Sequence, residues 1–218
     1  MPKITTAGYA LLGVLSVRAR STYELVQYMK ESNLRAIWSR AESQVYKEPK
    51  RLKHEGLAES RVEFQGERRR TLYRATRAGR RALREWLHEP SQRFTYRSEA
   101  MVKVSFGDFG SLEDLRRNIQ AIRHEAEEDA RVMLAFADAR ANLGPVTKRR
   151  THVNALVALF IIEMMEVRIR WARKAEEFIE SWTEAEGNEV SFQQGEDAWL
   201  EIRDRLKLLL AEADRRAA

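Results

Sequence analysis

Cationic and amide side chains recur at helical spacing in segment 43–55, and an unbroken run of three arginines follows at positions 68–70. Lysine and arginine neutralise phosphates, and glutamine, lysine and arginine on a helix that enters the major groove can read base edges. The two groups together therefore indicate contact with duplex DNA. Cationic residues are also common on a solvated helix face, so this interpretation depends on the elements that carry them.

Segment 43–55 is predicted to form an amphipathic helix, in which Val45 and Leu52 face inward at helical spacing. Gly56 suits the left-handed backbone position that ends many helices. The outward side then carries the polar and cationic residues Gln44, Lys47, Lys50, Arg51 and Lys53. We interpret this segment as a recognition helix.

Either Tyr46 or Pro49 completes the inward side of this helix, and Pro49 also raises the question of where the helix begins. A proline within a helix removes a backbone hydrogen bond and introduces a kink. The regular helix therefore either starts late, near Glu48, or bends at Pro49. The set of residues that face the bases depends on which of these holds.

A strand hairpin is predicted directly after the helix. Apolar residues between Leu57 and Phe64 recur with a period of two, residues 65–68 supply a turn, and residues 70–75 form the second strand. The tip of the hairpin carries Arg68, Arg69 and Arg70. A helix in the major groove with a basic hairpin beside it would hold one duplex at two places.

Further helical patterns surround these elements. Residues 7–16 are almost continuously apolar, Ser21 and Glu24 form a capping box that starts a second helix, and Thr76 caps another helix after the hairpin. The order helix, helix, helix, strand, strand, helix predicts a winged helix-turn-helix domain over residues 1–90.

Residues 91–218 are predicted to form an α-helical domain, so the fold class of the whole chain is mainly α. Segment 90–97 interrupts the periodicity as a hinge would. Three apolar helical stripes follow it, at 112–136, 153–182 and 199–209. The second domain therefore consists of helices alone.

The stripe from Val153 to Trp182 spans about eight helical turns, which is longer than a domain of this size needs for its own core. A partner surface explains that length, and a second copy of the chain is the simplest partner. Two copies related by a two-fold axis would place their winged helices about one turn of DNA apart, on the halves of an inverted repeat. The alternative is a three-helix bundle whose stripes are all covered internally.

Charge is distributed unevenly along the chain. Residues 1–90 contain 19 basic and 10 acidic side chains, a net charge of +9, whereas residues 91–218 contain 20 and 23, a net charge of −3. Affinity for a polyanion is therefore expected of the first part only. The main alternative is a winged-helix adaptor that binds protein without sequence-specific DNA binding, and the charge asymmetry argues against it.

Composition disfavours several other classes of function. The chain has no cysteine, which excludes disulfides, thiol nucleophiles and cysteine-bound zinc and fits a reducing cytoplasm. Its longest apolar run, 155–162, is too short to span a bilayer, and no secretory signal pattern opens the sequence. The four histidines lack metal-binding spacing, and no nucleophile with a paired base is recognisable. We expect a cytoplasmic protein that is not an enzyme and uses no metal or cofactor.

Sequence blocks along residues 7–88 resemble the PadR family of bacterial transcription regulators. The blocks and single positions are Ala10-Leu11-Leu12-Gly13-Val14-Leu15, Ser21-Thr22-Tyr23-Glu24-Leu25, Trp38, Ser43-Gln44-Val45-Tyr46, Lys50-Arg51-Leu52-Lys53-His54-Glu55-Gly56-Leu57, Tyr73-Arg74-Ala75-Thr76, Gly79, Leu83, Trp86 and Leu87. The remainder is similar to the longer helical C-terminal domain of the subfamily that includes repressors responsive to phenolic acids.

This resemblance implies a homodimer joined through its C-terminal helices, and a repressor that a small molecule releases from its promoter. It assigns the DNA contacts to Ser43, Gln44, Tyr46, Lys47, Lys50, Arg68, Arg69 and Arg70. The outward side of the recognition helix adds Arg51 and Lys53 to that set.

A small aromatic effector would need an apolar pocket, and aromatic residues of the chain are candidates to line it. An aromatic residue at helical spacing is more often part of a core. The candidates lie where the long stripe would meet the DNA-binding domain, and they are Trp38, Phe160, Met164 and Trp171.

Overall fold

The computed structural model describes residues 4–37, 42–141 and 150–217, and contacts divide the chain into two compact units. The first unit comprises Met1–Thr95 with Asp138–Ile161, and the second comprises Tyr96–Ala137 with Ile162–Ala218. The first unit thus contains the whole predicted winged helix together with part of the C-terminal half. The predicted division into domains 1–90 and 91–218 stays a prediction.

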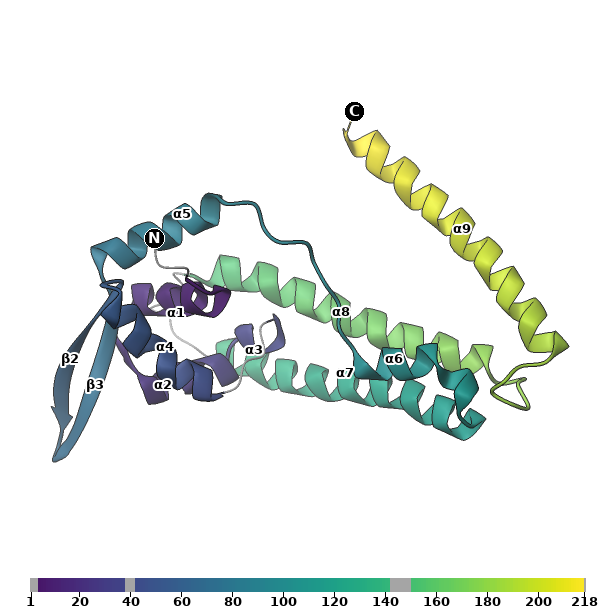
Figure 1. Ribbon diagram of the computed structural model, residues 1–218, viewed down its shortest axis with the longest axis horizontal. Coiled ribbons are helices and arrows are strands. Elements are labelled where there is room, and N and C mark those ends of the chain that lie inside the picture. The colour runs from purple at the N-terminus through teal and green to yellow at the C-terminus, as the bar shows by residue number, and fades with distance from the viewer. Residues whose placement is uncertain (1–3, 38–41, 142–149, 218) are drawn as a thin grey trace. The chain divides into compact units, whose positions relative to one another are not determined.

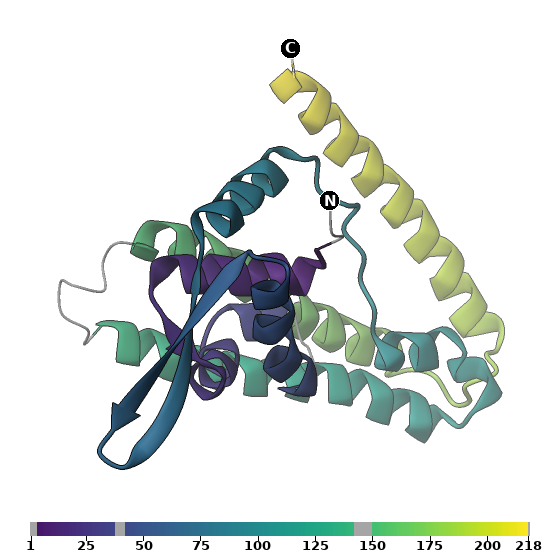
Figure 2. The same ribbon diagram turned by 60° about the vertical axis from the view of Figure 1, so that its left-hand side comes forward.

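The N-terminal part of the first unit is a winged helix (Figure 1), and its hairpin extends beyond the helices (Figure 2). The elements are, in order, α1 (Thr6–Val17), β1 (Arg20–Ser21), α2 (Thr22–Lys30), α3 (Leu34–Ile37), α4 (Glu42–His54), β2 (Ala58–Gln65), β3 (Arg68–Ala75) and α5 (Arg77–His88). The sheet is antiparallel, with strand order β1-β3-β2. The predicted fold class is confirmed, whereas the two short elements β1 and α3 were not predicted.

The core of this winged helix forms around α1. Helices α4 and α5 and strand β3 all pack on α1, and this packing requires apolar residues on most of its sides. Leu12 and Leu15 of α1 are fully buried, as are Leu25 of α2 and Leu52 of α4. Burial of a leucine side chain contributes about 2 kcal/mol to folding. The same core therefore holds the predicted recognition helix in a fixed orientation.

The predicted capping box at the start of α2 is confirmed. The Ser21 hydroxyl accepts a hydrogen bond from the Glu24 amide at 3.2 Å, and the Glu24 carboxylate accepts one from the Ser21 amide at 2.8 Å. Burial alone would raise the pKa of Glu24, but the hydrogen bonds from Ser21, together with the charges of Arg18 and Arg70, outweigh it and lower that pKa. Glu24 is therefore ionised at neutral pH and holds the first turn of α2 in place.

Two glycines let the chain reverse direction at the ends of β2. Gly56, after the end of α4, has φ of +71°, and Gly66, at the tip of the hairpin, has φ of +61°. Thr76 then caps α5 as predicted, since its hydroxyl accepts from the Gly79 amide at 3.0 Å and donates to the Gly56 carbonyl at 2.8 Å. This cap ties the start of α5 to the end of α4.

The remaining elements are helical and comprise α6 (Glu99–Ser105), the short η1 (Gly107–Phe109), α7 (Leu112–Ala141), α8 (Thr151–Phe178) and α9 (Glu189–Ala217). Helices α7 and α8 lie side by side (Figure 1). Ile119 of α7 packs with Ala172 and Ile179 in one buried cluster, and the Arg168 guanidinium contacts the Asp129 carboxylate at 2.7 Å. The second unit therefore has its own small core.

The C-terminal helices differ from their predicted extents. Helix α8 ends at Phe178, so the prediction that its stripe continues to Trp182 is wrong. Trp182 lies after the helix, where its indole N–H donates to the Gln194 side-chain oxygen at 2.8 Å. Helix α9 is longer than the predicted stripe at 199–209 and begins at Glu189.

We predict that Gly79→Ala destabilises the winged helix. A Cβ at Gly79 would lie 2.0 Å from the Leu57 carbonyl oxygen, a backbone atom that cannot move away without disturbing β2. The free energy of unfolding, measured in urea, should fall by about 1–3 kcal/mol. Gly13→Ala is the matched control, because a Cβ there meets nothing within 4 Å and should raise stability by about 0.5–1 kcal/mol. Equal stability of the Gly79 variant and the wild type would contradict the close contact between α5 and Leu57.

Candidate nucleic-acid interface

The buried side of α4 determines which residues of this helix face outward. Val45, Pro49 and Leu52 are buried, whereas Tyr46 is 42% exposed. Pro49 therefore completes the inward side. Because the helix already begins at Glu42, the alternative of a late start near Glu48 is wrong.

Three lysines at intervals of three residues lie on the outward side of α4. Lys47, Lys50 and Lys53 are exposed, and none forms an ion pair with a residue that the structure describes. Exposed Tyr46 lies beside them. The side chains of Ser43 and Gln44, which were also predicted to contact DNA, lie outside the described part of the structure. The described outward face therefore carries lysine charges that no described acidic side chain neutralises.

Arg51 differs from these lysines because it is paired within the domain. Its guanidinium donates to the Glu48 carboxylate at 3.2 Å and to the Glu55 carboxylate at 3.2 Å. A Cβ at Gly8 would lie 2.6 Å from the Glu48 Oε1 atom, so the backbone of α1 approaches this ion pair closely. The hydrogen bond to Glu48 raises the pKa of Arg51. Its predicted contact with DNA stays a prediction.

The wing places its arginines on opposite faces of the hairpin. Arg69 is exposed and lies directly across from Phe64, without an ion pair to any described residue. Arg70 faces the other way and contacts the Glu63 carboxylate at 3.3 Å. The Arg68 side chain lies outside the described part of the structure. Of Arg69 and Arg70, Arg69 is therefore the one without an ion pair to a described residue.

The structure does not gather the predicted effector-binding residues into one described pocket. Trp38 lies outside the described residues, and Phe160 is 47% exposed, with its ring 6.2 Å from that of Phe94. Met164 is partly buried, and Trp171 packs against the small core of the second unit. The effector site therefore stays a prediction.

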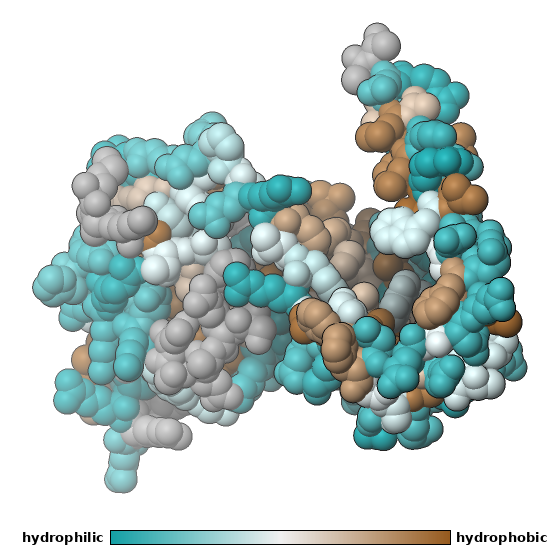
Figure 3. All heavy atoms as spheres, turned by 45° about the vertical axis from the view of Figure 1, so that its right-hand side comes forward, coloured by the Kyte–Doolittle hydropathy of each residue, from teal (hydrophilic) through white to brown (hydrophobic). Residues whose placement is uncertain are grey.

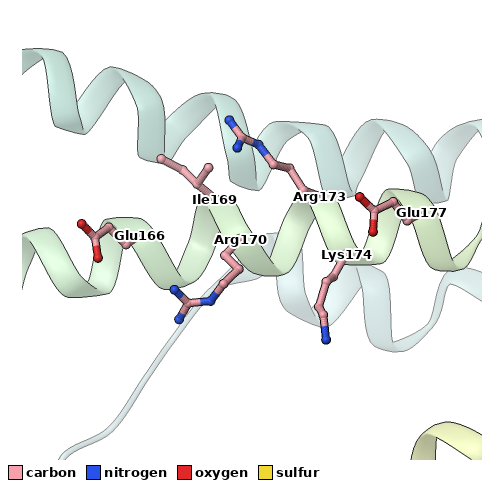
Figure 4. Close-up of a pocket in the computed structure, with 6 residues that line it drawn as sticks. All are labelled: Glu166, Ile169, Arg170, Arg173, Lys174 and Glu177. Carbon is pink, nitrogen blue, oxygen red and sulfur yellow. The ribbon is translucent and has the colours of Figure 1, made fainter.

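A shallow depression on α8 has a different lining. Its six residues all come from this helix and are mostly charged (Figure 4); they are Glu166, Ile169, Arg170, Arg173, Lys174 and Glu177. Their side chains point to different sides of the helix rather than converging on one point (Figure 4). Among the described residues, no cluster of histidine and carboxylate side chains is suited to hold a metal ion. The cationic face of α4 and the wing is thus the candidate site that the described side chains support.

The fold and this face define a winged helix-turn-helix protein. Residues 11–85 match the model of the transcriptional regulator PadR-like family, and residues 96–180 match that of the virulence activator alpha C-terminal domain. The N-terminal domain, over residues 11–85, is therefore similar to the PadR-like family of transcriptional regulators. The predicted family resemblance is therefore confirmed.

Individual relatives agree with this assignment. The chain is 37% identical over 101 residues to the negative transcriptional regulator PadR of Bacillus subtilis, a match that covers 45% of this chain and 54% of the relative. The matched part thus spans about half the length of that curated relative. No helix in the described part of the chain is long and apolar enough to cross a membrane.

Solved structures share the fold. Bacillus subtilis PadR in complex with operator DNA matches with a TM-score of 0.68 and 24% identity, over 80% of this chain and 99% of that one. The same protein in complex with p-coumaric acid matches with a TM-score of 0.63 and 22% identity, over 81% of this chain and 100% of that one. The Vibrio cholerae virulence activator AphA matches with a TM-score of 0.59 and 23% identity, over 78% of this chain and 95% of that one.

We predict that Arg51→Ala lowers the stability of the winged helix by about 1 kcal/mol, because it leaves the partly buried carboxylates of Glu48 and Glu55 without their shared cation. Chemical denaturation of the purified variant measures this change. Lys50→Ala removes a neighbouring charge that has no such partners and should stay within about 0.5 kcal/mol of the wild type. Equal effects of the two substitutions would show that the Arg51 pairs contribute nothing specific.

Proposed function

We propose that this protein is a homodimeric DNA-binding repressor that a small-molecule effector releases from an inverted-repeat operator. The observation that carries the proposal is the row of Lys47, Lys50 and Lys53 on one helix, together with Arg69 on the wing, all exposed and unpaired within the described structure. Cationic groups in this arrangement suit phosphates on either side of a groove that α4 enters.

The proposed DNA contacts remain those predicted from the sequence, namely Ser43, Gln44, Tyr46, Lys47, Lys50, Arg51, Lys53, Arg68, Arg69 and Arg70. Phosphate contacts would position the protein, whereas Gln44, Tyr46 and Lys47 in the first turns of α4 would specify sequence. The net charge of +9 on residues 1–90 supports a polyanionic partner.

The relatives support the regulatory part of the proposal. The Bacillus subtilis relative is a negative transcriptional regulator, and its structures include operator DNA and p-coumaric acid. We propose a similar role here, with a cytoplasmic location and a small aromatic effector. Trp38, Phe160, Met164 and Trp171 are the proposed effector contacts, and exposed Phe160 supplies a ring face on which an aromatic compound can stack.

Exposed apolar side chains on α8 and α9 support the proposed homodimer. Leu156, Phe160 and Val167 of the predicted α8 stripe are 67%, 47% and 46% exposed, whereas the internally packed side of α8 carries other residues. These three residues of the predicted stripe are therefore largely uncovered by the described residues, whereas Trp171 packs against the small core of the second unit. Such a surface is expected to bury itself against a partner.

Helix α9 exposes apolar side chains to a greater extent than α8. All of residues 199–216 are exposed, and Figure 3 shows apolar side chains along this helix. Trp199, Ile202, Leu206 and Leu209 recur at alternating intervals of three and four residues. This is the spacing of a coiled-coil seam, which requires a second helix. We propose that a second copy of the chain supplies that helix.

We predict that Arg69→Ala weakens binding to all duplexes and lowers the salt slope of binding by about one, because a phosphate contact is lost. The measurement is fluorescence anisotropy with a labelled duplex at several salt concentrations. Arg84→Ala, an exposed cation of α5, is the control and should leave the slope unchanged. Arg51→Ala in the same titration tests its predicted contact. Weak association of the wild type that does not depend on salt or sequence would support the protein-binding adaptor instead.

We predict that Leu206→Glu converts the dimer to a monomer at micromolar concentration, because it places a charge in the proposed seam of α9. Size-exclusion chromatography with light scattering gives the mass directly. Leu208→Glu is the matched control, since Leu208 is 69% exposed and lies off the seam, and it should remain dimeric. A monomeric wild type would contradict the dimer.

A further inference from the structure

The outer half of the wing carries two apolar side chains that the described structure leaves uncovered. Val62 is 46% exposed and Phe64 is 70% exposed, although both belong to the regular strand β2. Burial of a phenylalanine side chain is worth about 2 kcal/mol, and here that contribution is not realised within the protomer. Neither residue contributes to the hydrophobic core, so the wing does not need them for folding.

These two side chains lie on the face of the sheet that also packs on the helices. Residues two apart along a strand share a face, and so do directly opposed residues of an antiparallel pair. Nearer the body of the domain, this face carries Ala58 and, across from it, Ala75, which are both buried against the helices. Further along the hairpin, toward its tip, the same face carries Val62 and Phe64.

The two faces of the outer wing differ in charge. On the face of Phe64, the directly opposed residue is Arg69, whose charge is unneutralised among the described residues. On the other face, Glu63 contacts Arg61 at 2.7 Å and Arg70 at 3.3 Å. An exposed phenyl ring and a free guanidinium thus share one face, and the paired charges occupy the other.

This combination suits a partner that offers negative charge and an apolar surface side by side. The minor groove of duplex DNA does so, because phosphates border sugar and base surfaces there. Proteins that bind the minor groove often insert an apolar side chain at a base step while arginine binds beside it. A protein partner would present separate carboxylates, and these would not require a phenyl ring at the tip of a basic hairpin.

We propose that Phe64, flanked by Val62, is an apolar wedge that enters the minor groove and partly unstacks a base step, while Arg69 binds an adjoining phosphate. This inference rests on the proposed function, since it requires that the protein binds duplex DNA. The wedge selects for deformable DNA, and pyrimidine–purine steps unstack most easily. The wing therefore contributes sequence preference without hydrogen bonds to base edges.

The test uses the full-length protein and the duplex that the wild type enriches most from a random-sequence library. A 2-aminopurine base at successive positions outside the α4 site reports unstacking through its fluorescence. Wild-type protein should raise the fluorescence at one step, and Phe64→Ala should abolish that rise and weaken binding about tenfold, with the salt slope unchanged. Phe64→Leu should keep most of both effects, because leucine also serves as a wedge.

Phe109→Ala is the matched control, since Phe109 is 86% exposed but belongs to η1 and not to the wing. It should change neither fluorescence nor affinity. If Phe64→Ala binds DNA within twofold of the wild type and gives the same fluorescence, the wedge is overturned. A lowered salt slope for Phe64→Ala would also overturn it, because the lost affinity would then come from the phosphate contact of Arg69. If the wild type enriches no duplex at all, the proposed function itself fails.

Discussion

The candidate interface depends on the burial of one side of α4. Val45 and Leu52 enter the same core as α1, Pro49 on the same side is buried, and this packing fixes the rotation of the helix about its axis. Turning the helix by one position would bring charged or polar residues into that core, where an unpaired charge costs several kcal/mol. The outward direction of Lys47 and Lys50 is thus determined by apolar packing, and the cationic face exists before any DNA is bound.

Ion pairs within the domain decide which cationic residues remain available to a partner. Arg51 has carboxylates three positions before it and four positions after it on the same helix, and Arg70 has Glu63 across the hairpin. Lys50 and Arg69 have no such neighbours among the described residues. The net charge of a segment does not distinguish these cases, whereas the spacing of acidic residues around each cation does.

The sequence predicted best those features that depend on a few neighbouring residues. The capping box at Ser21 and the glycine that ends α4 are local, and both are confirmed. Strand β1 was missed because its two residues pair with Leu72 and Tyr73, which are distant in sequence, and α3 has only four residues. On α8 the periodicity marked an apolar stripe of which Leu156, Phe160 and Val167 are exposed and Trp171 is packed internally, because Ala172 and Ile179 on an adjacent side of the chain form the buried cluster. The periodicity of a sequence shows that a helix has apolar sides, but it does not show which element or which chain packs on each side.

The exposed stripe on α9 links folding to assembly. A helix of 29 residues that is exposed throughout residues 199–216 has little tertiary stabilisation there, and an isolated helix is marginal in water. Pairing of Trp199 and Leu206 with a second chain would supply the missing burial, so formation of this helix and dimerisation would be coupled. An effector with different affinities for two arrangements of that pair would then change the spacing of the two winged helices. In such an arrangement, an effector could change DNA affinity without touching α4.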